Sequence, residues 1–335
     1  MISKLYVTES PSFFAPENLA AEAVLTSAVR PGELILYLWQ NEKTVVIGKN
    51  QNAWKECRLE ALLEDGGTLV RRQSGGGAVF HDLGNLNVSF CVSRVDEDIP
   101  RQTRVILRAL RSMGVQAERT GRNDLEADGR KFSGHAVFRQ GTACCHHATL
   151  MLKVDREALE NYLRVSPLKL RSRGVESVRA RVMNLADRYP NLTIPSLCAA
   201  LKQALSEEYR LPAEPFPRDA RLTEADREQM REMRIRFESW DWTFGRRIPF
   251  DLEEQARFPW GEADLQLHIE AGRIRDCRCY TDAMDPLWTE GMEEALKGIR
   301  FTPEEIRAAF RGLPAGEEPQ MRTDLEQLLL KLVNG

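Results

Sequence analysis

The sequence lacks paired cysteines. It contains seven cysteines, an odd number, and no two of them stand at C-x-x-C spacing. Neither the adjacent residues Cys144 and Cys145 nor the pair Cys277 and Cys279 matches the spacing of a zinc finger. The N-terminal stretch MISKLYVTES has no apolar core of a signal peptide. We therefore expect free thiols and a reducing, cytoplasmic location.

Long apolar runs and an excess of basic residues are absent as well. The longest apolar stretches, such as LILYLW at 34–39, are far too short to span a bilayer. Lysine and arginine number 47 against 50 aspartates and glutamates, a formal net charge of −3. Nucleic-acid binders usually carry a basic excess. We therefore expect neither a membrane nor a nucleic acid as partner, and 335 residues are enough for two domains.

The patterns that are present predict an α+β fold. Helices are expected at 16–32, 101–114, 195–209 and 223–236, and strands at 1–10, 34–40, 43–49, 86–92 and 146–154. In 86–92, apolar and polar residues alternate, which predicts a half-buried strand. The dipeptide Asp128-Gly129 predicts a tight hairpin turn, which places Lys131 at the start of the returning strand.

The aromatic stretch ESWDWTFGRRIPF, residues 238–250, marks the expected domain junction. Beyond it, the sequence predicts a hairpin turning at Ala271-Gly272, followed by three helices. We therefore expect a larger domain over residues 1–245 and a small α+β domain over residues 246–335.

The stretch RRQSGGGAVFHD, residues 71–82, contains three consecutive glycines between two strand-like runs. Such a loop can present backbone N–H groups to an anion, and the guanidinium groups of Arg71 and Arg72 match phosphate or carboxylate. No Gly-Lys-Ser/Thr follows, and the AVF run after the glycines favours a strand, so neither a P-loop nor a Rossmann loop is expected. A β-bulge or a flexible surface turn with solvated arginines remains the alternative.

Lys131 is the second candidate for chemistry. The dipeptide Asn123-Asp124 lies across the predicted hairpin, so the turn brings a cation close to a carboxylate. That grouping suits a site that handles phosphate with a divalent metal. A solvated surface lysine is the alternative.

Four of the five histidines are His81, His135, His146 and His147, close to the glycine loop and to Lys131. No pair has HExxH spacing, so a histidine metal site is not expected. Cys144 and Cys145 directly precede His146, and a thiol beside an imidazole can act as a nucleophile. Two small buried residues at a strand start are the alternative.

Several blocks together resemble the lipoate–protein ligase A family, in the superfamily shared with biotin ligases and lipoyl or octanoyl transferases. RRQSGGGAVFHDLGN at 71–85 is similar to the family's RRxSGGGAVFHDxGN block, and GRKFSGHA at 129–136 is similar to its lysine block. HHATLML at 146–152 resembles HHGTLLL, and VVIGKNQNAWKEC (45–57), SVRARVMNL (177–185) and WDWTFG (240–245) resemble further landmarks. The resemblance runs from about residue 5 to residue 270, and the last helices fit the family's small accessory domain.

The resemblance implies a large mixed-sheet catalytic domain and an ATP-dependent ligase. In the family, lipoate attacks ATP to give lipoyl-AMP, and the lipoyl group then passes to a lysine of a lipoyl domain. The implied cosubstrates are ATP and Mg²⁺, and the implied acceptors are E2 subunits of 2-oxoacid dehydrogenases and the glycine cleavage H protein. Lipoate and octanoate are not distinguished at this point, and a monomer is expected.

The resemblance also assigns residues. Lys131 is the implied catalytic residue, Asp124 an implied Mg²⁺ ligand, and residues around 240–255 the implied hinge between domains. The implied contacts to ATP or lipoyl-AMP are Arg72, Gly75, Gly76, Gly77, Ala78, Val79, Phe80, Asn85, Asp124 and Lys131. The implied contacts to lipoate are Trp39, Arg72, Lys131, His135 and His147, with Val79 as a further wall of the tail pocket. Two residues depart from the family pattern. His135 stands where the family has a small residue, and Ala148 stands where it has a glycine.

Three rival functions remain open from the sequence. One is a transferase that forms an acyl-thioester on Cys144 or Cys145 without ATP. Another is a transferase that uses preformed lipoyl-AMP. The third is a non-catalytic sensor that binds lipoate or an adenylate.

Overall fold

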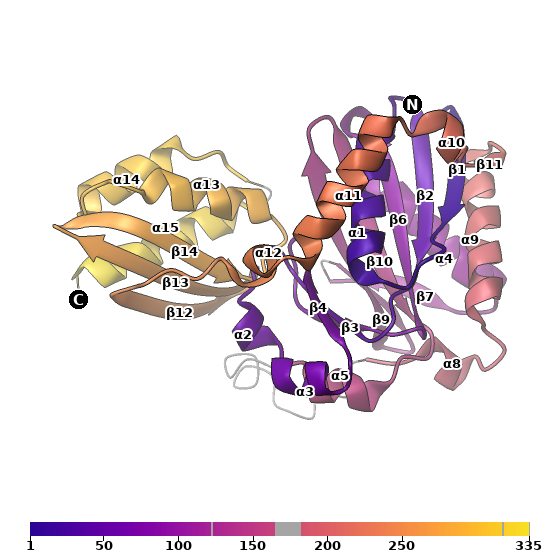
Figure 1. Ribbon diagram of the computed structural model, residues 1–335, viewed down its shortest axis with the longest axis horizontal. Helices are drawn as coiled ribbons and strands as arrows, with labels where there is room; N and C mark the ends of the chain where they lie inside the picture. Colours follow the sequence, from indigo (N-terminus) through magenta and orange to yellow (C-terminus); the bar gives the residue numbers. More distant parts are fainter. Residues whose placement is uncertain (122, 165–181, 317, 335) are drawn as a thin grey trace.

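The computed structural model describes residues 1–121, 123–164, 182–316 and 318–334 (Figure 1). The fold is α+β, as the sequence predicts, with one large mixed sheet, a small sheet beside it, and a separate three-stranded sheet near the C-terminus. In the SVRARVMNL landmark, residues 177–181 lie outside the described residues.

The large sheet has eight strands in the order β11-β1-β2-β6-β10-β9-β8-β7. Their bounds are β1 (Lys4–Glu9), β2 (Glu33–Trp39), β6 (Asn85–Ser93), β7 (Ala117–Thr120), β8 (Asp124–Ala127), β9 (Arg130–Gln140), β10 (Ala143–Met151) and β11 (Ala213–Pro215). From β2 through β6, β10, β9 and β8 to β7, each strand runs antiparallel to the next. Strand β1 pairs in parallel with both β2 and β11. The predicted hairpin turn is confirmed: Asp128 and Gly129 have φ of 51° and 70° and join β8 to β9.

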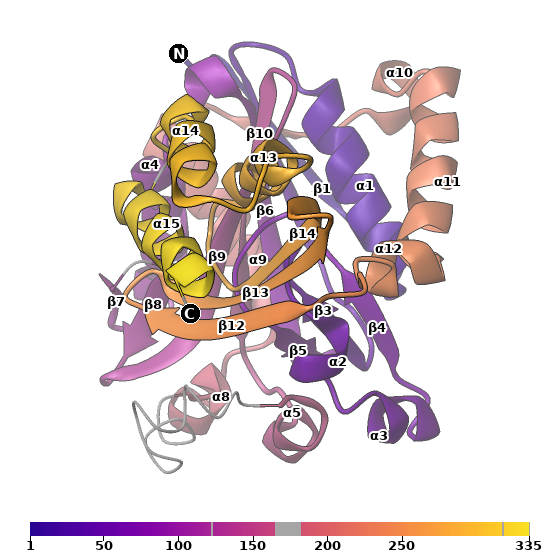
Figure 2. The same ribbon diagram turned by 90° about the vertical axis from the view of Figure 1, so that its left-hand side faces the viewer.

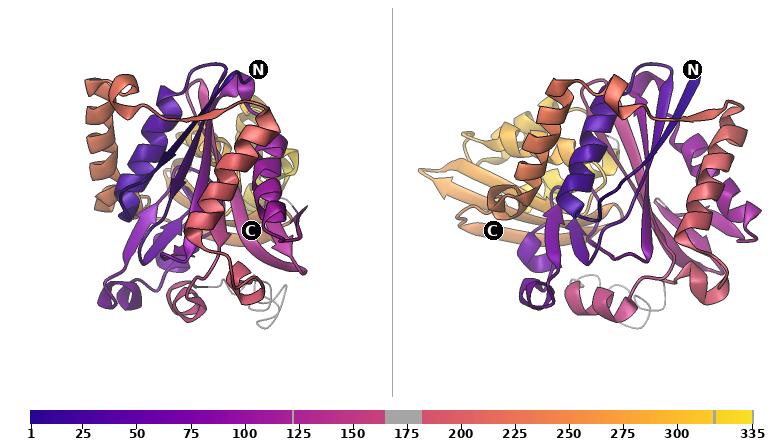
Figure 3. Two further views of the ribbon diagram at one scale, coloured as in Figure 1. Left: turned by 90° about the vertical axis from the view of Figure 1, so that its right-hand side faces the viewer. Right: turned by 45° about the vertical axis from the view of Figure 1, so that its right-hand side comes forward.

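Helices cover both faces of this sheet (Figure 3). On one face lie α1 (Ala15–Ala28) and α11 (Glu224–Glu238), and on the other lie α4 (Ile99–Ser112) and α9 (Ile194–Tyr209). The prediction of a half-buried strand at 86–92 is therefore wrong, because all nine residues of β6 are buried. Its apolar residues, such as Phe90, enter the core with α4 and α9, and Cys91 enters the core with α1.

A three-stranded sheet in the order β4-β3-β5 holds the glycine loop. It consists of β3 (Thr44–Ile47), β4 (Thr68–Arg71) and β5 (Val79–His81), beside the short helices α2 (Ala53–Glu56), α3 (Leu59–Glu64) and α5 (Arg156–Tyr162). Strand β3 lies between β4 and β5, so the loop 72–78 crosses over the end of β3. The strand expected after the glycines is confirmed as β5.

The C-terminal part has its own core around Leu265, Met292 and Phe310. It contains β12 (Leu252–Phe258), β13 (Gly261–Glu270), β14 (Arg273–Thr281), α13 (Pro286–Leu296), α14 (Pro303–Gly312) and α15 (Pro319–Asn334). The hairpin turn at Ala271 and Gly272 is confirmed by φ of 49° and 72°. Strand β12 escaped prediction because its sequence LEEQARF has no clean alternation.

Short elements complete the described residues: η1 (Arg94–Asp96), α8 (Leu185–Arg188), α10 (Arg218–Arg221) and α12 (Trp240–Phe244). Helix α12 lies within the predicted junction, between the two larger bodies in Figure 1. Across the described residues, every helix is too short or too polar to cross a membrane.

In the view of Figure 2 the C-terminal part lies in front of the large sheet. Hydrogen bonds join it to the glycine loop and to the segment after β3. Gly76 N donates to Ala283 O at 3.0 Å, and Thr281 N donates to Asn50 O at 2.9 Å. The Lys49 ammonium lies 2.9 Å from a Glu290 carboxylate oxygen. Asn50 Nδ2 also donates to Pro286 O at 2.9 Å, and the Lys55 ammonium lies 2.7 Å from Asp264 Oδ2. These contacts are polar, as is common between domains of one chain.

Two glycines of the loop provide a matched test of this docking. A Cβ at position 75 would lie 2.3 Å from Ala283 O and 2.8 Å from Met284 O, whereas a Cβ at position 77 meets no atom within 4 Å. A side chain that lies this close to backbone atoms cannot avoid them by changing its rotamer. Such overpacking typically destabilises the folded state by about 1–3 kcal/mol. We expect Gly75→Ala to displace residues 283–285 and to accelerate amide hydrogen exchange at Gly76, measured by mass spectrometry. Gly77→Ala is the control, and equal exchange in the two variants would contradict the docking contact.

Candidate active site

A cavity of about 140 Å³ lies between the glycine loop and the large sheet. Its lining comes from the loop, from α1, from strands β2, β3, β5, β6, β9 and β10, and from the residue before β8. The lining residues are Leu19, Trp39, Val46, Arg72, Gly76, Gly77, Ala78, Val79, His81, Asn87, Asn123, Lys131, Gly134, His135, Ala136, His147, Ala148 and Thr149.

Most of the site residues expected from the sequence meet at this cavity. Trp39, Arg72, Gly76, Gly77, Ala78, Val79, Lys131, His135 and His147 all belong to the lining. Gly75, Phe80, Asn85 and Asp124 do not. Phe80 packs instead in the core of the small sheet, and the Asn85 side chain donates to Asn87 Oδ1 at 3.2 Å. The ligand roles of all these residues stay predictions.

Strand register explains why distant residues share the floor of the cavity. Trp39 on β2 pairs with Asn87 on β6, and Asn87 pairs with Thr149 on β10. Residues directly opposite in a ladder point to the same face. Gly134 on β9 donates its N–H to Thr149 Oγ1 at 3.2 Å and extends the row. The floor therefore crosses four strands, from Trp39 to the segment of β9 that carries Lys131.

The two arginines before the glycines build the loop rather than extend into solvent. Arg72 is 7% exposed, and its Nη2 donates to Gly75 O at 2.7 Å and to Gly77 O at 2.8 Å. Its Nη1 donates to Val46 O and its Nε to Ser74 Oγ. The alternative of a flexible turn with solvated arginines is therefore wrong.

Arg71 acts in the same way one residue earlier. Its Nη1 donates to the carbonyl oxygens of Gly48, Lys49 and Gln51. Its Nε donates to Trp242 O at 3.0 Å, which ties β4 to helix α12. Burial lowers the pKa of Arg71 to about 9 and that of Arg72 to about 10. Both groups therefore stay charged at neutral pH and place positive potential beneath the loop.

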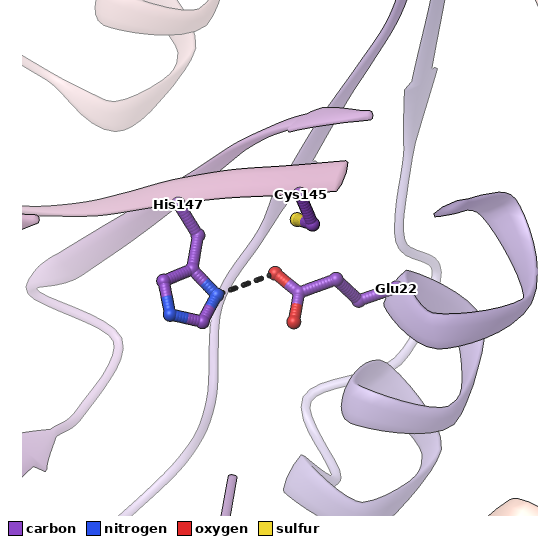
Figure 4. Close-up of side chains that lie close together, drawn as sticks. All are labelled: Glu22, Cys145 and His147. Atoms are coloured by element: carbon purple, nitrogen blue, oxygen red, sulfur yellow. Dashed lines mark hydrogen bonds and ion pairs between the residues drawn. The ribbon is translucent and has the colours of Figure 1, made fainter. Parts of the chain in front are cut away.

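A hydrogen-bonded chain joins the loop to helix α1, and Figure 4 shows its bond between His147 and Glu22. His147 Nδ1 lies 2.9 Å from Glu22 Oε1, and His147 Nε2 lies 2.8 Å from Ser74 Oγ. Because a carboxylate only accepts, the Nδ1 atom of His147 carries a proton that it donates to Glu22. Ser89 Oγ also donates to Glu22 Oε1 and receives the indole N–H of Trp39. The chain fixes the orientation of the His147 ring at the cavity wall.

The sequence patterns did not point to Glu22, Ser74 or Ser89 as site residues. Glu22 stood inside the predicted helix as a single acid within an apolar run, and it is 2% exposed. A lone carboxylate on the buried side of a helix needs a partner, which was the available signal. The partner itself, 125 residues away on β10, could not be found without the fold.

Lys131 lies where the hairpin places it, with its ammonium 2.7 Å from Asp124 Oδ1. The predicted pairing of a cation and a carboxylate is confirmed. Both side chains are about one-third exposed, so both remain accessible to a ligand. One carboxylate suits Mg²⁺ that arrives with a nucleotide, since such ions are commonly held by one or two carboxylates plus substrate phosphates.

His146 and the two cysteines of β10 are buried, and His135 is partly buried at the cavity wall. His135 Nδ1 lies 2.8 Å from His146 Nε2, and His146 Nδ1 lies 2.9 Å from Gln102 Oε1. Burial lowers the pKa of His135 to about 3. Cys144 and Cys145 are buried within β10, and burial raises the pKa of both thiols. A thiol held in its neutral form is a poor nucleophile, which argues against the thioester mechanism.

One group of possible metal ligands occurs among the described residues, formed by Glu22, Cys145 and His147. Their ligand atoms lie within 4.8 Å of one another. The carboxylate and the imidazole already pair with each other, and the thiol is neutral. The hydrogen bond by which Glu22 orients the His147 ring therefore explains why these side chains lie together.

Comparison with known proteins gives consistent results. The family described as "Lipoyl protein ligase A/B catalytic domain" matches residues 15–206, and "Bacterial lipoate protein ligase C-terminus" matches residues 247–330. A curated relative, lipoate-protein ligase A of Psychrobacter cryohalolentis, is 35% identical over 300 residues, which cover 88% of each chain.

Solved structures agree with the sequence relatives. The structure of P. falciparum LipL1 in complex with lipoate superimposes with a TM-score of 0.84 at 25% identity, over 98% of this chain and 99% of that one. A lipoate-protein ligase A bound with ATP has a TM-score of 0.63 at 27% identity, over 73% of this chain and 99% of that one. With its glycine loop, its hairpin lysine and both family matches in place, the chain belongs to the lipoate–protein ligase A family.

Proposed function

We propose that the protein activates lipoate with ATP to lipoyl-AMP and transfers the lipoyl group to a lysine of a lipoyl domain. The observation that carries the proposal is the cavity itself, with a cation, Lys131, at one end of its floor and the aromatic wall of Trp39 at the other. Relatives with bound lipoate and with bound ATP support both substrates.

The adenylation step brings two anions together. A carboxylate oxygen of lipoate forms a bond to the α-phosphorus of ATP, and the bond from that phosphorus to the bridging oxygen breaks as pyrophosphate leaves. Lys131 neutralises the α-phosphate and the attacking carboxylate, and buried Arg72 adds positive potential beneath the loop. The loop from Gly75 to Phe80 shapes the space for the adenylate. We assign the Mg²⁺ that accompanies ATP to Asp124 and phosphate oxygens.

The transfer step needs no enzyme nucleophile. The neutral amine of the acceptor lysine attacks the acyl carbon, a C–N bond forms, and the bond to the AMP oxygen breaks. The amine loses one proton and AMP departs. The cavity lies beneath the loop and beside the docked C-terminal part, which shields the mixed anhydride from water.

The two bodies divide the work in this proposal. Residues 1–245 form the catalytic domain, and residues 246–335 form an accessory domain that docks on the glycine loop through Ala283. The segment 240–255 is the hinge. A solved archaeal lipoylation system that pairs a ligase with its E2 lipoyl domain supports lipoyl domains as acceptors. We include the glycine cleavage H protein as an acceptor, octanoate as a second acid, and a monomeric enzyme. Seven free, buried cysteines fit a reducing cytoplasm.

The reaction itself is tested with the intact protein, ATP, Mg²⁺, lipoate and an apo lipoyl domain. We expect the acceptor to gain the mass of one lipoyl group, read by intact mass spectrometry, only when ATP is present. A mass gain from preformed lipoyl-AMP but none from ATP and lipoate would sink the adenylation step.

Lys131→Ala tests the assigned cation. We expect loss of lipoyl-AMP formation by at least about 100-fold with the fold intact, because one charged group at a reacting phosphate contributes about that much or more. The control is Lys153→Ala, which removes an exposed lysine just after β10. The readout is lipoyl-AMP by liquid chromatography, with circular dichroism as the fold check. Near-normal adenylate from Lys131→Ala would overturn the assignment.

Replacement of both Cys144 and Cys145 by alanine tests the thioester alternative. The two thiols are buried and neutral, so we expect ATP-dependent ligation to continue at a rate within about threefold of the parent, with some loss of stability from the cavities. Ligation assays at 20 °C on folded protein give the answer. Complete loss of transfer with normal lipoyl-AMP formation would support the mechanism through an acyl-thioester.

A further inference from the structure

Two buried N–H donors without partners lie at the Trp39 end of the cavity. They belong to His81 and Asn87, which both line the cavity and are both 3% exposed. His81 Nε2 and Asn87 Nδ2 have no hydrogen-bond partner among the described residues. Buried polar groups without partners are rare in folded proteins and call for an explanation.

The proton position on His81 follows from its neighbours. Asn18 Nδ2 donates to the carbonyl oxygen of Gln40 at 2.8 Å, which fixes the Asn18 amide. The same Nδ2 donates to Asn41 Oδ1 at 3.0 Å, so the Asn41 amide is fixed with its Nδ2 directed at His81 Nδ1, 3.2 Å away. His81 Nδ1 therefore accepts.

Burial, together with the nearby positive charge of Arg72, lowers the pKa of His81 to about 3. The ring is neutral at physiological pH, and its single proton must lie on Nε2. That nitrogen is the one without a partner. His81 thus contributes an N–H donor, and no acceptor, to the cavity lining.

Asn87 contributes the second donor. Its Oδ1 accepts from Asn85 Nδ2 at 3.2 Å, so its own Nδ2 carries two protons that remain unmatched. Asn87 pairs directly with Trp39 across β6 and β2 and shares its face of the sheet. The His81 ring meets the Trp39 ring edge to face at 6.4 Å. Both donors therefore stand beside the same aromatic wall.

This end of the cavity is distant from the cation. Trp39 lies on β2 and Lys131 on β9, three strand spacings apart, or roughly 14 Å. Under the proposed function, on which this inference rests, the carboxylate of the acid lies at Lys131 and its far end reaches Trp39. The indole N–H of Trp39 already donates to Ser89 Oγ, so it is not available as a donor to a bound acid.

We propose that His81 and Asn87 make the cavity select acids that carry lone-pair acceptors at the far end, such as the dithiolane sulfurs of lipoate, over octanoate. Octanoate ends in a methyl group and leaves both donors buried and unmatched. Sulfur is a weak acceptor, but it contacts an N–H more favourably than a methyl group does. A site with buried polar groups discriminates against the analogue that leaves them unpaired.

The test is competition between lipoate and octanoate in the complete ligation reaction, with the ratio of kcat/KM read from the two product masses. We expect lipoate to be preferred by about tenfold or more in the parent protein. His81→Phe and Asn87→Leu each remove a donor at similar volume, and each should lower the ratio about threefold to tenfold, mainly through a lower KM for octanoate. Val46→Ala, which trims an apolar part of the same lining, is the control and should change both acids equally.

A second measurement needs no variant and so does not depend on folding. The parent protein is given octanoate and 7-oxooctanoate, an acid of equal length with a carbonyl acceptor near its far end. We expect the keto acid to be used better than octanoate. Equal use of the two acids, or an unchanged ratio in folded His81→Phe and Asn87→Leu, overturns the inference. Failure of every acid to give an ATP-dependent mass gain refutes the proposed function instead, so the two failures are distinguishable.

Discussion

The site depends on one buried guanidinium. Arg72 binds carbonyl oxygens on both sides of Gly76, and it thereby gives a three-glycine loop a defined shape. Glycine has the largest backbone freedom of any residue, so such a loop needs an external constraint. Each buried carbonyl left without its donor costs about 1–3 kcal/mol, and Arg72 satisfies three of them. Its Nε also fixes Ser74, which passes the constraint to His147, Glu22 and Ser89 through successive hydrogen bonds. Loop, floor and aromatic wall are thus one connected structure.

The same loop is the surface on which the C-terminal part rests. Gly75 is close enough to Ala283 and Met284 that no side chain fits between them. Arg71 ties the start of the loop to helix α12, where the chain leaves the large sheet. Occupation of the cavity and docking of the C-terminal part therefore act on the same few residues. A ligand that shifts the loop must also alter the hydrogen bond between Gly76 and Ala283.

Local signals in the sequence carried much of the fold. Asp128-Gly129 and Ala271-Gly272 have φ values that few residues adopt, so both hairpins could be predicted from two letters each. Lys131 and Asp124 followed from the first hairpin. Partnerships across the sheets could not be predicted. Polar residues in an alternating strand usually face solvent. Asn87 and Cys91 on β6 are buried instead, because helices cover both faces of the sheet. Arg71 and Arg72 donate to carbonyl oxygens of their own chain, which no sequence spacing reveals, and the ligand role of Arg72 stays a prediction.

The central claim is that a carboxylic acid is activated at the Lys131 end of the cavity beneath the loop that Arg72 holds. ATP–pyrophosphate exchange tests it most directly, because exchange requires reversible adenylate formation and no acceptor protein. The account predicts that labelled pyrophosphate enters ATP only after lipoate is added, with Mg²⁺ present. Absence of lipoate-dependent exchange in folded protein that binds both ATP and lipoate would contradict it.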